Sequence, residues 1–297
     1  MRLGERANYQ AWRVTPDDFP LKGSSREQLQ FFLRYAVLAP SSHNSQPWHF
    51  IVSGEEIILT KNPTRLLPVC DPQMRLTYIA LGCALTNIII AADYFGFTTE
   101  IENRTENHGD QVAKIHFQKK GIATASSDHH IFAIPRRRVN RGGYETRSIP
   151  EPVVSWLRAQ STSSLSIDVV QNDGQKRAIA AYIAAGRMRA FSNPAFRQEL
   201  ARYKRTNLTR SQNGMPGFTM GFPTLLSLVA PLAIRLFNVT KLMRRHDDRL
   251  FTTDTAAFVI ISGGEDSLWG ACLLGQKLEQ ILLEMEARGL ATSIQVI

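Results

Sequence analysis

The chain has 297 residues, 43% of them hydrophobic, and its 35 Lys and Arg against 26 Asp and Glu give a formal net charge of +9. That much apolar material supports one large core or two fused ones, which excludes a disordered protein. Three cysteines, Cys70, Cys83 and Cys272, form no Cys-x-x-Cys pair. The sequence therefore argues against a disulfide framework or a structural zinc site, and it fits a reducing cytoplasm.

The positive charge raises the possibility of a nucleic-acid partner. Arginines are mixed with acids along the chain, and the only dense cluster is Arg136, Arg137 and Arg138 with Arg141. Four guanidinium groups suit one phosphate or diphosphate better than a track along a duplex. With no recognition-helix or aromatic RNA-binding signature, we expect no nucleic-acid partner and assign most of the surplus charge to solubility.

Membrane and export signals are weak. The N-terminus opens into a polar stretch without the apolar core of a secretory signal. The longest apolar segment, 222–237, contains Pro223, Pro231 and Arg235 and is shorter than the roughly 20 residues that a spanning helix needs. We expect a cytoplasmic protein with no membrane partner, in which this segment is a buried or lid helix.

The first predicted helix begins at Ser25, where Gln28 completes a capping-box pattern, and it ends before Pro40. A strand is predicted over 50–52. Between them lies a polar loop bracketed by two prolines, with the candidate ligand-binding residues Pro40, Ser41, Ser42, His43, Asn44 and Gln46. Such a loop suits ligand binding better than core packing. The alternative is that its hydroxyls and amides only bond their own backbone, and His43 in particular is typical of a structural histidine.

An internal repeat organises the chain. A shift of 193 residues lays Leu81-Gly82 onto Leu274-Gly275, and it then lays Gly96 onto Gly289. Each copy reads as a long helix that ends at a glycine and is succeeded by a strand. The repeat predicts two related α+β halves, residues 1–130 and 131–297.

The second half carries additional elements. Its sequence predicts a helix from Pro150 to Ala159, a strand over 165–170 and helices over 175–191 and 194–204. Residues of about 205–250 form an insertion whose Gly- and Pro-rich part, 214–223, fits a lid-forming loop and a plain surface connection equally well.

These motifs resemble a known family. Pro40-Ser41-Ser42-His43-Asn44-Ser45-Gln46-Pro47-Trp48 resembles the P-S-S-x-N-x-Q-P-W loop of the FMN-dependent nitroreductase superfamily. Asp71-Pro72-x-x-Arg75 and Leu81-Gly82 resemble the approach to its central helix. Arg137-Arg138-Val139-Asn140-Arg141 is similar to the arginine-rich motif that holds the flavin phosphate in that family. The repeat resembles the tandem, dormancy-associated branch, in which one chain folds as its own pseudo-dimer.

The resemblance implies an α+β, nitroreductase-like fold that binds FMN. It assigns the polar loop to the ring and ribityl chain, and Arg137, Arg138 and Arg141 to the phosphate. It also implies an oxidoreductase that takes a hydride from NAD(P)H and reduces a nitroaromatic or quinone-like acceptor, with no catalytic side chain required. A fused pseudo-dimer implies a monomer or a weak homodimer. The first half lacks the arginine motif, so we expect one flavin per chain.

The sequence leaves three hypotheses open: a nitroreductase-type enzyme, a flavin-binding or sequestering protein without turnover, and a basic interaction module without a ligand. No nucleotide-binding P-loop or serine-hydrolase elbow supports another chemistry. His129-His130 lacks the i, i+4 partner of a helical metal site, so no metal is predicted.

Overall fold

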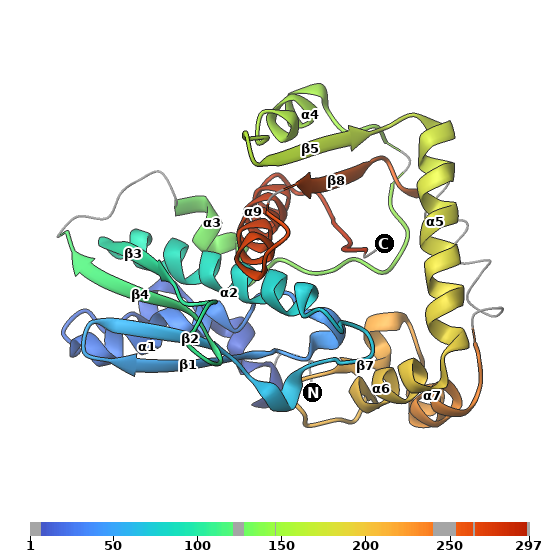
Figure 1. Ribbon diagram of the computed structural model, residues 1–297, viewed down its shortest axis with the longest axis horizontal. Coiled ribbons are helices and arrows are strands. Elements are labelled where there is room, and N and C mark those ends of the chain that lie inside the picture. Colours follow the sequence, from blue (N-terminus) through green and yellow to red (C-terminus); the bar gives the residue numbers. More distant parts are fainter. Residues whose placement is uncertain (1–6, 121–127, 146, 240–253, 264, 296–297) are drawn as a thin grey trace. The chain divides into compact units, whose positions relative to one another are not determined.

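The computed structural model describes residues 7–120, 128–145, 147–239, 254–263 and 265–295 (Figure 1). The fold is α+β, as predicted, and the chain divides into two compact units. Unit 1 comprises Met1–Arg137 and Glu265–Leu290, and unit 2 comprises Arg138–Gly264 and Ala291–Ile297. These units differ from the predicted halves, 1–130 and 131–297, because residues 265–290 pack with the N-terminal part of the chain. That the two halves arose by duplication stays a prediction.

Unit 1 contains a four-stranded antiparallel sheet with strand order β1-β2-β4-β3. The predicted strand over 50–52 is confirmed as part of β1. The buried side chains of Ile57, Leu59, Ile115 and Phe117 face the core, whereas Ile51 is 45% exposed. This alternation is typical of an antiparallel sheet with one covered face. The strand bounds are β1 Trp48–Ser53, β2 Glu56–Lys61, β3 Phe97–Asn103 and β4 Gln111–Lys119.

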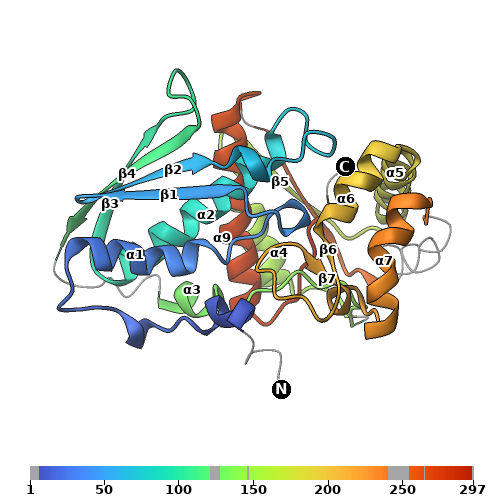
Figure 2. The same cartoon turned by 90° about the horizontal axis from the view of Figure 1, so that it is seen from below.

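Helices α1 (Ser25–Ala36) and α2 (Arg75–Tyr94) pack on each other and on this sheet (Figure 2). By length and composition α2 could cross a membrane, but 78% of its apolar window is buried within the fold. It is therefore the core helix of unit 1. Short 3-10 helices cover Ala7–Arg13, Pro16–Asp18, Ser42–Asn44 and Pro63–Arg65.

The start of α1 corrects the predicted capping box by one residue. Ser24 is the N-cap, and its Oγ accepts a hydrogen bond from the backbone N–H of Glu27 at 3.3 Å. The Glu27 carboxylate accepts one from the backbone N–H of Ser24 at 2.8 Å. Ser25 is the first helical residue, and Gln28 is buried and donates to the Pro20 carbonyl instead. The pattern of a capping box fits both pairs, but only Ser24 has the extended backbone of an N-cap.

Replacing Ser24 tests this assignment. We expect Ser24→Ala to lower the free energy of unfolding by about 1 kcal/mol, since the first turn of α1 loses its capping hydroxyl. Ser25→Ala is the matched control and should change it by less than about 0.5 kcal/mol, because alanine is at least as good a helix former as serine. Urea unfolding monitored by circular dichroism measures both. Equal losses in the two variants would contradict the Ser24 cap.

Helix α9 (Leu268–Ala287) crosses α2 inside unit 1, and the two repeat glycines lie at the crossing (Figure 1). A Cβ on Gly82 would overlap the backbone carbonyl of Cys272, and a Cβ on Gly275 would overlap that of Ile79. Each overlapped residue lies three positions before the opposite glycine. The Cys83 Sγ donates to the Gly275 carbonyl at 3.2 Å. The helices thus approach so closely that only glycine fits.

The two long helices lead into different structures at their C-terminal ends. Gly96 has a φ of 76° and leads into β3, as predicted. Gly289 has a φ of 73°, but within 290–295 the structure forms only one parallel β-bridge, between Val139 and Thr292. The predicted strand after Gly289 is therefore wrong in the described part of the chain, because no second ladder pair forms there.

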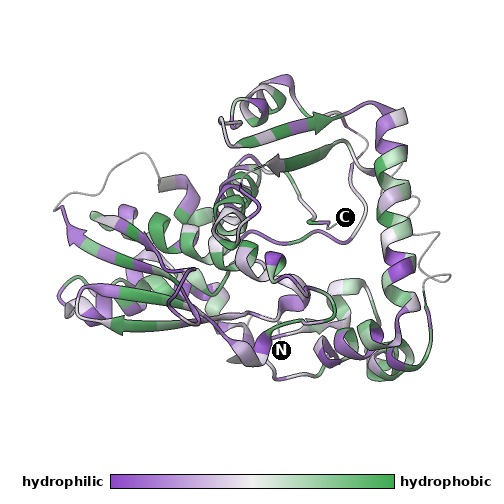
Figure 3. Ribbon diagram, viewed as in Figure 1, coloured by the Kyte–Doolittle hydropathy of each residue, from purple (hydrophilic) through white to green (hydrophobic). Residues whose placement is uncertain are grey.

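Unit 2 contains the additional helices and strands predicted between the two repeat copies, each within two residues of its predicted bounds. Strands β5 and β8 pair antiparallel, and β8 is apolar from Phe258 to Ile261 (Figure 3). Two short strands, β6 and β7, pair parallel. The bounds are α4 Glu151–Arg158, β5 Leu165–Val170, α5 Asp173–Ser192, α6 Pro194–Tyr203, β6 Lys204–Arg205, β7 Met215–Pro216, α7 Thr224–Leu236 and β8 Phe258–Gly263.

The predicted insertion, about 205–250, is described up to residue 239; its remainder lies outside the described residues. Residues 217–220 form a 3-10 helix, and α7 comes after it. Leu225 is 80% exposed, whereas Ser227 and Ile234 are buried. The apolar segment is therefore a helix with one exposed apolar face rather than a buried one. Its role as a lid stays a prediction.

Candidate functional site

The polar loop between α1 and β1 is folded on itself. The Ser41 carbonyl accepts a hydrogen bond from the Asn44 N–H at 2.9 Å, and the Ser41 Oγ accepts one from the Gln46 N–H at 3.0 Å. Arg65 Nη1 donates to the Gln46 carbonyl at 3.2 Å. The hydroxyl of Ser41 therefore bonds its own loop, as the structural alternative predicted for these side chains.

The same loop holds three non-glycine residues in the left-handed region. The φ angles are 56° at His43, 50° at Asn44 and 55° at Gln46. Asparagine and histidine are enriched in this conformation, whereas glutamine adopts it at a cost of about 1 kcal/mol or more. Backbone strain of this kind clusters at ligand-binding sites, where the surrounding structure fixes it.

The loop's side chains remain within reach of a ligand. All six predicted loop residues are half-buried, namely Pro40, Ser41, Ser42, His43, Asn44 and Gln46. The Gln46 side-chain amide donates to Asn44 Oδ1 at 3.4 Å, so the two amides lie side by side. Trp48 is only 5% exposed and belongs to the core. The structure thus brings the loop residues together as one polar patch on a rigid base.

Arg137, one of the three arginines assigned to the phosphate, lies in the core of unit 1. Its side chain is 4% exposed, its Nε lies 3.4 Å from Glu279 Oε1, and its Nη2 donates to the Leu38 carbonyl at 2.9 Å. The Glu279 side chain is fully buried, and burial raises its pKa to about 7, with Arg137 and Asn87 opposing the rise. The Arg137 guanidinium is therefore engaged by a buried carboxylate, and its phosphate role stays an untested prediction.

Arg138 and Arg141 belong to unit 2, in which Arg138 is exposed and the Arg141 guanidinium is partly buried where it contacts Met215. Arg141 Nη2 contacts the Met215 Sδ at 3.8 Å, and Lys204 Nζ contacts the Met220 Sδ at 2.7 Å. Burial lowers the pKa of Lys204 to about 7, and the charge of Arg141 adds to that effect. Burial also lowers the pKa of Arg141, with Arg187 adding to it. Within the described residues, no carboxylate pairs with Arg141 or Lys204.

These three cations, Arg141, Arg187 and Lys204, form what we call the cationic group of unit 2. Like charges in partly buried surroundings repel one another, and an anion between them removes the cost. A phosphate suits such a group because guanidinium and ammonium donors form charge-assisted hydrogen bonds with its oxygens. Sequence reasoning missed Lys204 and Arg187, since nothing near them along the chain marks them as partners of Arg141.

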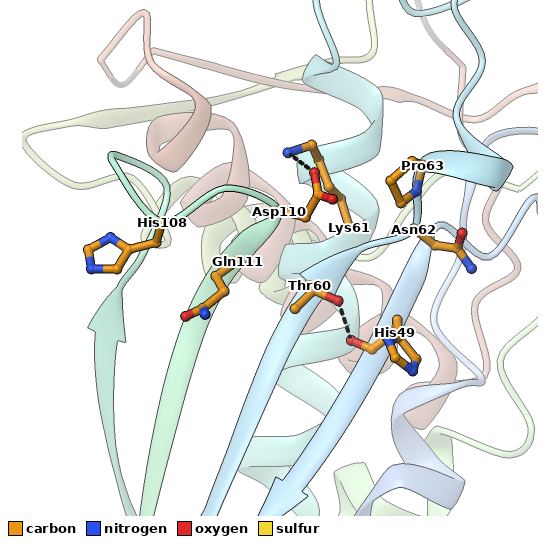
Figure 4. A pocket seen from close by; sticks show the side chains of 8 residues that line it. All are labelled: His49, Thr60, Lys61, Asn62, Pro63, His108, Asp110 and Gln111. Atoms are coloured by element: carbon orange, nitrogen blue, oxygen red, sulfur yellow. Dashed lines mark hydrogen bonds and ion pairs between the residues drawn. The ribbon is translucent and has the colours of Figure 1, made fainter.

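A separate hollow of about 390 Å³ lies at one end of strands β1, β2 and β4 (Figure 4). Its lining residues are His49, Thr60, Lys61, Asn62, Pro63, His108, Asp110 and Gln111. Lys61 is paired with Asp110 at 2.7 Å, so its charge is already compensated. None of the predicted site residues lines this hollow, and we assign it no role.

Comparison with profiles of known protein families finds no match. Among curated proteins, the chain is 28% identical to "Uncharacterized protein Rv3127" of Mycobacterium tuberculosis (strain H37Rv), over 88% of this chain and 76% of that protein. It is 25% identical to "Putative NAD(P)H nitroreductase acg" of the same organism, over 88% and 77%. It is 29% identical to "Putative NAD(P)H nitroreductase Rv3131", over 46% and 39%. The chain is thus a distant homologue of proteins named as nitroreductases, which agrees with the resemblance of its motifs and supports a general, nitroreductase-like oxidoreductase.

Proposed function

We propose that this chain is an FMN-binding oxidoreductase of the nitroreductase type, which takes electrons from NAD(P)H and passes them to nitroaromatic or quinone-like acceptors. One observation carries the proposal. The loop with the family's P-S-S-x-N-x-Q-P-W pattern is held in a costly backbone conformation, with its amide and hydroxyl groups half-exposed.

The polar loop suits the polar edge and ribityl chain of a flavin. The Asn44 and Gln46 side-chain amides offer donors and acceptors next to each other, and the Ser42 hydroxyl adds a third group. Because the backbone is already fixed by the bonds from Ser41 and Arg65, the loop loses little entropy when a ligand binds.

The cationic group of unit 2 suits the flavin phosphate. We assign the phosphate to Arg141 and Lys204, with Arg138 nearby in the sequence, and leave Arg137 in its core pair with Glu279. Each charge-assisted hydrogen bond contributes on the order of 1.5–3 kcal/mol. Bound FMN would supply the redox chemistry, accepting a hydride from NAD(P)H and reducing the acceptor. The chain's own residues bind and orient it, and no side-chain acid is needed.

The crossing of α2 and α9 supports the fused pseudo-dimer as part of this proposal. Gly82 contacts Cys272, and Gly275 contacts Ile79. The 193-residue shift of the repeat converts one contact into the other, because it lays Gly82 onto Gly275 and Ile79 onto Cys272. A helix pair related by a two-fold axis has such reciprocal contacts. We propose that the chain is a cytoplasmic monomer or weak homodimer with one flavin.

Flavin content tests the proposal. The purified chain should show a flavin absorption spectrum, and Arg141→Ala and Lys204→Ala should each weaken FMN binding by about 10- to 100-fold, because each removes a charge-assisted contact. Asn44→Ala should weaken it as well. Arg136→Ala is the matched control, since Arg136 is exposed and pairs with Glu286 at 3.8 Å. Unchanged FMN affinity in both Arg141→Ala and Lys204→Ala would overturn the phosphate assignment.

Turnover is tested on the same sample. NADPH or NADH should bleach the flavin spectrum, and a nitroaromatic or quinone should restore it. Flavin that is bound but neither bleached nor reoxidised would identify a flavin-sequestering protein. A chain without flavin affinity would leave the basic interaction module as the surviving hypothesis.

A further inference from the structure

We infer that His129, His130 and Glu284 form a binding site for a late first-row divalent metal ion such as Zn²⁺. The adjacent histidines lie on α3 (Asp128–Ala133), and Glu284 lies on α9. The sequence alone argues against a metal site, because no metal-binding residue lies four positions after either histidine, where it would share a helix face with it. The fold supplies the third ligand from a helix more than 150 positions further along the chain.

The three side chains converge on one point. Glu284 Oε2 lies 3.1 Å from His129 Nε2 and 2.8 Å from His130 Nε2. All three ligand atoms lie within 4.8 Å of one another. Ligand atoms around a tetrahedral zinc ion lie about 3.3 Å apart, given metal–ligand distances of about 2.0–2.1 Å. An ion can therefore enter between them with small movements of the side chains.

The residues around the three ligand atoms also support metal binding. Arg288 Nε donates to Glu284 Oε1 at 2.7 Å, so that oxygen is held and Oε2 is presented to both imidazoles. Carboxylates that bind a metal are in turn hydrogen-bonded by outer-shell residues, and Arg288 has that position here. The His129 side chain is 53% exposed and that of Glu284 only 11%. The site therefore has a fixed base, and it is open to solvent on the side of His129.

The donor set selects the class of ion. Two imidazole nitrogens and one carboxylate oxygen suit Zn²⁺, Co²⁺, Ni²⁺ or Cu²⁺, whereas Mg²⁺ and Ca²⁺ require mostly oxygen ligands. Because α3 has only six residues and packs against α9, an ion at this point would fasten the short helix to α9. The same geometry without an ion is a hydrogen-bonded cluster around Glu284, which is the competing outcome.

Metal titration of the whole chain tests the site. Metal-free protein should bind one Zn²⁺ per chain by calorimetry, and Co²⁺ should give the intense visible absorption of a tetrahedral complex. His129→Ala/His130→Ala should abolish both signals. Arg288→Gln keeps all three ligands and should weaken Zn²⁺ binding by about 10- to 100-fold. The matched control is His116→Ala, which removes an imidazole that pairs with Glu56 at 2.9 Å in the same unit.

Thermal unfolding provides the second readout. Zn²⁺ should raise the Tm of the parent chain and of His116→Ala, and should leave that of the double variant unchanged. Circular dichroism establishes that the double variant is folded. The inference is overturned if the parent binds no more Zn²⁺ than the double variant does, or if His116→Ala loses binding to the same extent.

Discussion

The Gly82→Ala variant is expected to unfold at a much lower urea concentration than the parent chain, with a loss of about 3 kcal/mol or more. The added Cβ would overlap the backbone carbonyl of Cys272 and lie 3.0 Å from the Gln276 amide nitrogen. Backbone atoms cannot rotate out of the way as a side chain can. Helix α9 would have to move outward, which would lengthen the hydrogen bonds that Cys83 and Thr86 make to it at 3.2 Å.

Two further variants make this result specific. Gly275→Ala should lose a similar amount, because its Cβ would overlap the carbonyl of Ile79 in the reciprocal contact. Gly186→Ala is the matched control: Gly186 also lies inside a helix, α5, but nothing lies within 4 Å of the position of its Cβ. There alanine should stabilise by about 0.5–1 kcal/mol. A Gly82→Ala chain as stable as the parent would contradict the close crossing of α2 and α9.

The Arg137→Met variant is expected to lose about 3–5 kcal/mol at pH 8, since it leaves the buried Glu279 carboxylate without its cation. Arg136→Met is the matched control from the adjacent position. Arg136 lies 3.8 Å from Glu286 and its side chain is 57% exposed, so its loss should cost less than about 1 kcal/mol. Urea unfolding at fixed pH measures both variants.

The loss in Arg137→Met should depend on pH in a defined direction. Burial raises the pKa of Glu279 from 4.5 to about 7, so between these values the native state holds a proton that the unfolded state has released. This protonation stabilises the native state at low pH, and the contribution falls as the pH rises through that window. At pH 5 the Glu279 side chain is protonated and neutral in the native state. Removing Arg137 then leaves no buried negative charge without a partner. The loss should therefore be clearly smaller at pH 5 than at pH 8.

Two outcomes would contradict this account. An equal loss at pH 5 and pH 8 would mean that Arg137 stabilises the core by packing alone. A double variant, Arg137→Met/Glu279→Leu, that recovers no stability at pH 8 would mean the same, because it removes both charges and fills the space with apolar atoms.

Much of the fold could be predicted from local patterns. The capping-box pattern and Pro40 indicated α1, and the repeat that ends at Gly96 and Gly289 indicated α2 and α9 with Gly82 and Gly275. The repeat could not reveal that these two glycines lie at one helix crossing. A sequence period identifies which residues share a face of a helix, but it does not identify the element that packs against that face. The cap of α1 was misplaced because Ser24 with Glu27 and Ser25 with Gln28 both satisfy the same pattern.

The part of the candidate site that is contiguous in sequence could be predicted, whereas the contacts between residues far apart along the chain could not. The polar loop is contiguous, so one short pattern was enough to propose all of its residues, and their role in binding stays a prediction. An arginine run does not reveal which member is buried, and Arg137 meets Glu279 only through the packing of α9. Lys204 near Arg141 and Glu284 near His129 and His130 are likewise pairings between residues far apart along the chain. Such clusters depend on long-range packing that no short motif records.

The place of α9 in unit 1 has a consequence for synthesis of the chain. Residues 1–137 emerge from the ribosome long before residues 265–290, which complete their core. Until then, the face of α2 around Gly82 has nothing to pack against, and Arg137 lacks its carboxylate partner. The apolar helix α2 therefore stays exposed in the nascent chain until the intervening residues have been translated. Chaperone binding to the nascent chain should be strongest during this interval.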